Sequence, residues 1–132
     1  SARILANPSL SAQEALFKIG QGFIEMMSSK RGASICRLVL QEADRHTKVA
    51  KFFYESGPLF LENMLAQYLQ QPKVAKLFHI EQPRQAAANF FALIKGGYHL
   101  RLQLKIKPTP TQKELDAHVR ETVRLFFKLY GK

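Results

Sequence analysis

The segment from Pro83 to Ile106 constrains the fold most, because it carries two apolar stripes where a surface helix needs only one. At about 100° per residue, the two stripes lie on helix faces about 110° apart. The first stripe comprises Ala86, Phe90, Leu93, Gly97, Leu100 and Leu104, and the second comprises Ala87, Phe91, Ile94 and Tyr98. One stripe can pack against the rest of the chain. The other needs a further partner, which is a neighbouring helix, a ligand or a second copy of the protein.

Length and composition predict one globular domain. The chain has 132 residues, of which 46% are apolar, and this is enough to bury a core without disulfides or metals. No apolar run reaches the roughly 18 residues that a membrane span requires. The N-terminus shows no secretory signal pattern, so we expect a soluble protein without a membrane partner. Cys36 is the only cysteine, which fits a reducing cytoplasm and a small core residue.

The charge is strongly positive, with 20 Lys and Arg against 10 Asp and Glu. Such an excess suggests nucleic-acid binding. However, the cations are scattered along the whole chain and do not alternate with aromatic residues as they do in single-strand binders. The sequence also contains no zinc-finger, RNP-like or helix-turn-helix pattern. We therefore expect only non-specific, salt-sensitive affinity for polyanions in this chain.

Catalysis and metal chemistry have little support in the sequence. No nucleophile lies in a recognisable motif, and the Gly96-Gly97 pair lies inside a helical pattern where close helix packing explains it better than phosphate binding. The four histidines, His46, His79, His99 and His118, include no pair at the i, i+4 spacing of a helical metal site. We expect no enzyme, no metal and no cofactor.

Two capping boxes mark helix starts, one at Ser11 with Glu14 and one at Thr111 with Glu114. The apolar spacing predicts further helices over about 33–44, from Thr47 onward, and from Pro83 onward. Residues 1–7 show neither a cap nor an amphipathic period, so residues 1–10 are predicted to form a tail and 11–132 the domain. The last helix is expected to end at Gly131.

Two places in this pattern are ambiguous. Gly57-Pro58 interrupts an apolar pattern, and proline inside a helix removes a hydrogen bond and clashes with the preceding turn. We favour a sharp kink in one long helix over a break between two helices. Residues 100–107 alternate strictly between apolar and polar, as strands do. Because no other segment offers a partner strand, we predict helix to about Leu104 and an unravelled chain before Pro108.

Several blocks of the sequence resemble the C-terminal domain of TetR-type transcriptional regulators, and more narrowly its AefR-like branch. The blocks are Arg37-Leu38-Val39-Leu40, Glu42-Ala43-Asp44-Arg45, Ala50, Phe53-Tyr54-Glu55-Ser56-Gly57-Pro58, Gln85-Ala86-Ala87, Phe90-Phe91-Ala92-Leu93-Ile94-Lys95-Gly96, His118-Val119, Leu125-Phe126 and Tyr130-Gly131. Their order and spacing cover most of the chain from about Ser11 onward.

The resemblance implies an all-α bundle of about five to six helices that forms a homodimer through its last two long helices. It also implies a small apolar or aromatic effector, which would control operator DNA binding by an N-terminal helix-turn-helix domain. That domain is not part of this sequence, and residues 1–10 would then be the remnant of its linker.

Side-chain chemistry selects candidates within this scheme. Met and aromatic residues suit adaptable apolar recognition, and a histidine can add a polar contact. The predicted effector-binding residues are Phe23, Met27, Phe53, Met64, Tyr68, Phe90, Ile94 and His99. The predicted dimer-interface residues are Leu93, Gly97, Leu100, Leu104, His118, Thr122 and Phe126. The alternative is a helical interaction module without a ligand, whose basic surface meets acidic protein partners.

Overall fold

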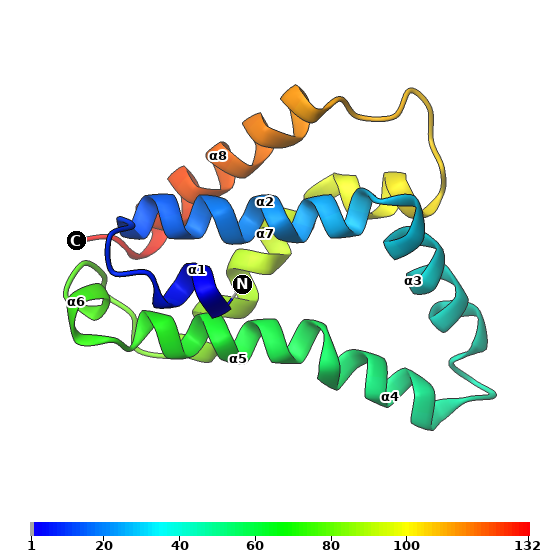
Figure 1. The fold of residues 1–132 in the computed structure, drawn as a ribbon, viewed down its shortest axis with the longest axis horizontal. Helices are drawn as coiled ribbons and strands as arrows, with labels where there is room; N and C mark the ends of the chain where they lie inside the picture. The colour runs from blue at the N-terminus through cyan, green and yellow to red at the C-terminus, as the bar shows by residue number, and fades with distance from the viewer. Residues whose placement is uncertain (1) are drawn as a thin grey trace.

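A computed structural model describes residues 2–132 and shows an all-α fold (Figure 1). The helices are α1 (Ala2–Ala6), α2 (Ala12–Ser28), α3 (Lys30–Glu42), α4 (Thr47–Ser56), α5 (Pro58–Leu69), α6 (Pro72–Ala75), α7 (Pro83–Gln103) and α8 (Gln112–Tyr130). The predicted fold class is confirmed. The two short helices α1 and α6, and a break within the predicted third helix, raise the number of helices above the expected five to six.

Both predicted capping boxes are present. The Ser11 hydroxyl accepts a hydrogen bond from the Glu14 amide at 3.1 Å, and the Glu14 carboxylate accepts one from the Ser11 amide at 3.2 Å. Thr111 and Glu114 repeat this reciprocal pair at the start of α8. These local bonds satisfy amide groups that a helix leaves unpaired at its first turn. They fix where α2 and α8 begin.

The first residues are ordered, which corrects the prediction of a tail. Residues 2–6 form α1, which packs against α2 and α5. Leu5 is buried in the core of the domain. Ile4 also packs against this core, and the burial of both side chains depends on distant residues that no local pattern reveals.

The chain breaks at Gly57, so the predicted kink in one long helix is wrong. Helix α4 ends at Ser56 and α5 begins at Pro58, while Gly57 has non-helical dihedral angles (φ −109°, ψ −92°). The Gly57 amide still donates to the Phe53 carbonyl at 3.0 Å. Proline then occupies the first position of α5, where its missing N–H costs nothing. Figure 1 shows the two helices following one another along one side of the molecule.

Helix α7 ends at Gln103. This confirms the prediction that the helix reaches about Leu104 and that the chain is not helical from there to Pro108. Its interior, however, is kinked at Gly96, which has φ 44° and ψ −142°. This positive φ is a conformation that L side chains rarely adopt. The expected close helix packing at Gly96-Gly97 is wrong for Gly97, because a Cβ there would meet nothing within 4 Å.

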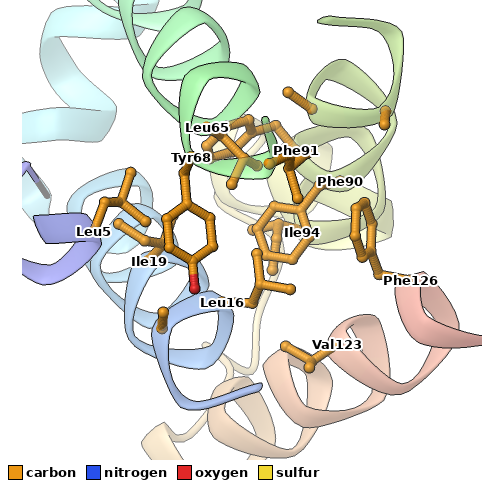
Figure 2. Close-up of a cluster of buried hydrophobic side chains, with 14 of the residues drawn as sticks. Leu5, Leu16, Ile19, Leu65, Tyr68, Phe90, Phe91, Ile94, Val123 and Phe126 are labelled. Atoms are coloured by element: carbon orange, nitrogen blue, oxygen red, sulfur yellow. The ribbon is translucent and has the colours of Figure 1, made fainter. Parts of the chain in front are cut away.

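The core lies where α2, α5, α7 and α8 meet (Figure 2). Phe90 of α7 and Phe126 of α8 are fully buried, with ring centroids 5.6 Å apart and nearly perpendicular planes. Close approach of α2 to α7 and α8 occurs at Gly20. A Cβ at Gly20 would lie 2.7 Å from Ile94 Cδ1 and 2.9 Å from Val119 Cγ1. The small residue that lets the helices touch is therefore on α2.

Helices α3 and α4 lie at the end of the bundle away from α6 (Figure 1) and bury little of their apolar surface. In α3 only Ala33 is buried, and in α4 no residue is buried. Several large apolar side chains there are exposed, among them Leu38, Leu40, Val49 and Phe52, which is 71% exposed. These two helices consequently contribute little to the core of the described chain.

Candidate functional site

Most of the predicted effector-binding residues are brought together by the fold. Six of the eight belong to, or pack against, one buried apolar cluster formed by α2, α5 and α7: Phe23, Met27, Met64, Tyr68, Phe90 and Ile94. Within this set Phe90 and Ile94 are 0% exposed, and Figure 2 shows both pointing toward α2. These six side chains thus gather in one packed cluster, while their role in effector binding stays a prediction.

The members of this set differ in burial and in their position within the cluster. Phe90, Ile94, Tyr68 and Met27 are buried and fill the space between the helices. Phe23 and Met64 are half-buried and lie at the margin of the cluster. The Phe23 ring contacts Phe91, with centroids 5.2 Å apart. Side chains at such a margin can move to admit a ligand at lower cost than side chains in the centre.

Phe53 and His99 lie apart from this cluster. Phe53 is half-buried on α4, the helix that buries none of its residues. His99 is half-buried on α7, beyond the Gly96 kink. Burial lowers the pKa of His99 below its ordinary value, and the nearby positive charge of Lys95 adds to this. The lowered pKa favours the neutral imidazole, in which one ring nitrogen is a donor and the other an acceptor.

Gln103 is a polar residue that the sequence did not single out. It follows His99 by four residues, so the two side chains leave α7 on the same face. Both polar atoms of the Gln103 amide, Nε2 and Oε1, are buried without a hydrogen-bond partner in residues 2–132. An unpaired buried amide costs about 1–3 kcal/mol, so a group that supplied the missing bonds would be bound favourably. In the sequence, Gln103 looked like one polar position of an alternating stretch.

Surface clefts also occur, and they are lined by other residues. One of about 400 Å³ lies between α2 and α8, with Phe17 and Val123 in its wall. Another of about 490 Å³ lies beside the start of α7, next to Pro83. A third, of about 370 Å³, lies between α3 and the end of α7. The predicted effector-binding residues do not line these three clefts, all of which open to solvent.

The predicted dimer-interface residues divide into three groups, of which the first two differ in exposure. Leu100 and Leu104 are 62% and 61% exposed, and Gly97 is also exposed, so a second chain could reach them. Thr122 and Phe126 are instead 1% and 0% exposed, because α8 turns this face toward the core of its own chain. These two positions cannot meet a second chain, and this corrects their assignment to the interface.

His118, also predicted at the interface, instead contacts the main chain of α7, and it uses the backbone carbonyl of Leu93 without involving the Leu93 side chain. The Nε2 atom of His118 lies 3.1 Å from the Leu93 carbonyl oxygen and 2.8 Å from that of Ile94. Both carbonyls lie in the turn of α7 that precedes the kink at Gly96. His118 thereby joins α8 to the broken turn of α7, and its ring packs on Tyr98 with centroids 4.8 Å apart.

The outward sides of α7 and α8 form a surface of small and apolar residues, here called the α7–α8 face. It consists of Ala88, Ala92, Leu93, Gly96, Ala117, Leu125 and Leu129, all exposed or half-buried. Small residues allow a second pair of helices to approach closely, and leucines provide apolar area to bury. The expected surplus of apolar surface on the last two helices is therefore present, but at positions that differ partly from those predicted.

Comparison with known families decides the relationship. The family described as the AefR-like transcriptional repressor, C-terminal domain, matches residues 14–132. The chain belongs to this family. This match confirms the resemblance to the AefR-like domain that the sequence blocks showed. No curated protein matches the chain.

Two solved structures share the AefR-like fold. One is a protein from Mesorhizobium loti assigned to the TetR family of transcriptional regulators, with a TM-score of 0.88 and 19% identity over 99% of this chain. The other is the flavonoid-responsive regulator FrrA, with a TM-score of 0.83 and 24% identity over 95% of this chain. The chain spans 64% and 63% of these two proteins, which is less than two thirds of either.

Two other properties bear on function. In the part of the chain that the structure describes, every helix falls short of the length or the hydropathy that a bilayer crossing requires. Among residues 2–132, no three His, Cys, Asp or Glu side chains gather closely enough to hold a metal ion. The family and both structural relatives consist of transcriptional regulators rather than enzymes.

Proposed function

We propose that this AefR-like domain senses a small apolar or aromatic effector and forms a homodimer in a cytoplasmic TetR-type transcriptional repressor. The observation that carries the proposal is the family match over residues 14–132, together with an uncovered α7–α8 face. In this scheme the operator is read by an N-terminal helix-turn-helix domain outside the present sequence. The effector would change the spacing of two such domains in a dimer.

The proposed effector site lies between α2, α5 and α7. Its buried wall is formed by Phe90 and Ile94, and its movable margin by Phe23 and Met64. Methionine and phenylalanine side chains can rearrange around ligands of different shape, because their contacts are apolar and not directional.

The polar end of the effector would meet His99 and Gln103. A neutral imidazole and an unpaired amide each offer one donor and one acceptor side, which suits hydroxyl and carbonyl groups. A carboxylate or an ammonium group would find no opposite charge in this pair. The positive charge of Lys95 near His99 would repel an ammonium group as well. The favoured effector is therefore an aromatic molecule with hydroxyl or carbonyl substituents and no positive charge. One structural relative, FrrA, is named as flavonoid-responsive, which agrees with this chemistry.

A thermal-shift panel of hydroxylated aromatics and their deoxy analogues tests the proposal. A ligand at 100 times its Kd adds about 2.7 kcal/mol to the stability of the folded chain, which is easily measured. We expect hydroxylated members to raise Tm more than the analogues without hydroxyl groups. Native mass spectrometry should then show one bound molecule per chain.

Gln103→Leu provides the matching variant. It removes an amide without a partner, so we expect the ligand-free chain to become more stable and the preference for hydroxylated ligands to shrink. Gln67→Leu, at an exposed position of α5, is the control and should change neither. If no member of the panel binds, the alternative of a helical interaction module without a ligand is the better account.

A further inference from the structure

A groove with a strongly basic lining lies between the start of α3, the end of α7 and the loop that follows it. It has a volume of about 370 Å³. Its lining residues, here called the basic groove, are Ser28, Lys30, Ala33, Ser34, Arg37, Arg101, Leu102, Lys105, Ile106, Lys107 and Thr109. None of them belongs to the proposed effector site, although Leu102 follows His99 by three residues and leaves α7 beside it.

The basic groove collects positive charge that its own lining does not neutralise. Five of its eleven residues are cationic, and none is acidic. Within residues 2–132, the ion pairs shorter than 4 Å involve Arg45, His46 and Arg124, all of them outside the groove. Five neighbouring cations repel one another, and this repulsion destabilises the ligand-free chain. An anion bound among them would relieve it.

Neutral contacts hold three of these cations in place. Arg37 donates to the Ser34 hydroxyl at 3.3 Å, and Lys107 donates to the Thr109 hydroxyl at 3.2 Å. Arg101 donates to the Pro108 carbonyl at 3.5 Å.

Arg101 also stacks over the Tyr98 ring, with its guanidinium carbon 5.4 Å from the ring centroid. Its charge helps to lower the pKa of Glu114, after the two hydrogen bonds from Thr111, but the carboxylate of Glu114 is not part of the groove. These contacts orient the guanidinium without cancelling its charge, as a preformed anion site requires.

The groove also has an apolar part. Ala33 is buried at its base, Leu102 is half-buried and Ile106 is 49% exposed. A volume of about 370 Å³ lies at the lower end of the range for small-molecule sites, about 300–1,000 Å³. Bare inorganic anions would use only the cations and leave this surface in contact with water.

We propose that the basic groove binds a small organic anion, with phosphate or carboxylate oxygens held by the cations and an apolar body resting on Leu102 and Ile106. Guanidinium and ammonium groups bind both kinds of oxygen, so phosphate esters and aromatic carboxylates share the chemistry that the groove recognises. The groove is independent of the effector site. Its occupancy would tie the first turn of α3 to the end of α7.

Isothermal titration with the purified chain tests the proposal. Phenyl phosphate and phthalate are the organic probes, and methyl phosphate is the probe with similar charge but almost no apolar body. At 20 mM salt we expect phenyl phosphate to bind at least fivefold more tightly than methyl phosphate. Ile106→Ser should remove most of this difference, because the side chain is half-exposed and its loss leaves the fold intact. Equal binding of the two phosphates to the unaltered chain would overturn the apolar part of the proposal.

A pair of charge variants separates a site from general attraction. Lys30→Gln with Lys105→Gln should weaken phenyl phosphate binding at least tenfold. Lys73→Gln with Lys76→Gln removes the same charge at α6, at the opposite end of the molecule (Figure 1), and should change affinity less than twofold.

Three results would overturn the proposal. The first is an equal loss of affinity in both double variants, and the second is the absence of binding by every probe. The third is tight binding of random-sequence duplex DNA that the organic anions do not displace, because this would identify the groove as a contact for the nucleic-acid backbone.

Discussion

Substitution of the two adjacent glycines of α7 should have opposite effects on stability. Gly96 has φ 44°, and a Cβ there would lie 3.2 Å from Cε1 of His118. An L side chain in the left-handed region costs about 1–2 kcal/mol, before any displacement of His118. Gly97 is helical, and a Cβ there meets nothing within 4 Å. Alanine at this position should therefore stabilise the chain by about 0.5–1 kcal/mol.

The expected gap between Gly96→Ala and Gly97→Ala is thus about 1.5–3 kcal/mol. For a domain of this size each kcal/mol moves Tm by about 3–5 °C, so the gap is measurable by thermal melts as well as by urea denaturation. Both variants must be compared at one protein concentration, because self-association would also shift Tm.

Equal effects of the two substitutions would refute this reasoning. A stabilising Gly96→Ala would mean that α7 runs straight through residue 96 in solution. In that case the contact between His118 and the carbonyls of Leu93 and Ile94 would not form, since a straight helix would use these oxygens itself.

Three further predictions follow from burial and charge. In α2, Gly22→Ala should stabilise the chain by about 0.5–1 kcal/mol, because nothing lies near the new methyl group. Gly20→Ala should leave the chain about 1–3 kcal/mol less stable than Gly22→Ala, because its methyl group overlaps the core. Urea denaturation measures both variants. Because burial lowers the pKa of His99, the unfolded chain binds more protons at this residue than the folded chain does. The free energy of unfolding should therefore fall as pH drops below about 6.5. His99→Gln should reduce this pH dependence in denaturation curves recorded from about pH 5 to 8. Ala92→Arg should weaken self-association at least tenfold in sedimentation experiments, whereas Ala75→Arg, at an exposed position of α6, should leave it unchanged.

Local signals in the sequence were sufficient for most helix boundaries. The capping boxes at Ser11 and Thr111 and the proline at position 83 act through neighbouring residues, so the sequence alone locates these helix starts. Helical periodicity also identified Phe90 and Ile94 as apolar positions of α7, on two different stripes, and both are fully buried. The fold class followed from these features and from the resemblance to the AefR-like domain.

Features that depend on distant contacts could not be predicted in this way. The kink at Gly96 is completed by His118, which lies 22 positions later in the chain on α8. The burial of Leu5 depends on α2 and α5, which follow it in the sequence. Periodicity also cannot say which face of α8 turns toward its own chain, and Thr122 was assigned to an interface although it is buried in that chain.

The molar mass of the chain in solution tests the central claim most directly. Sedimentation equilibrium at micromolar concentration should give roughly 30 kDa, twice the 15.1 kDa of one chain. Such a mass would agree with pairing through the α7–α8 face. A mass of 15.1 kDa that persists at tens of micromolar would contradict the proposal that this domain joins two subunits of a repressor.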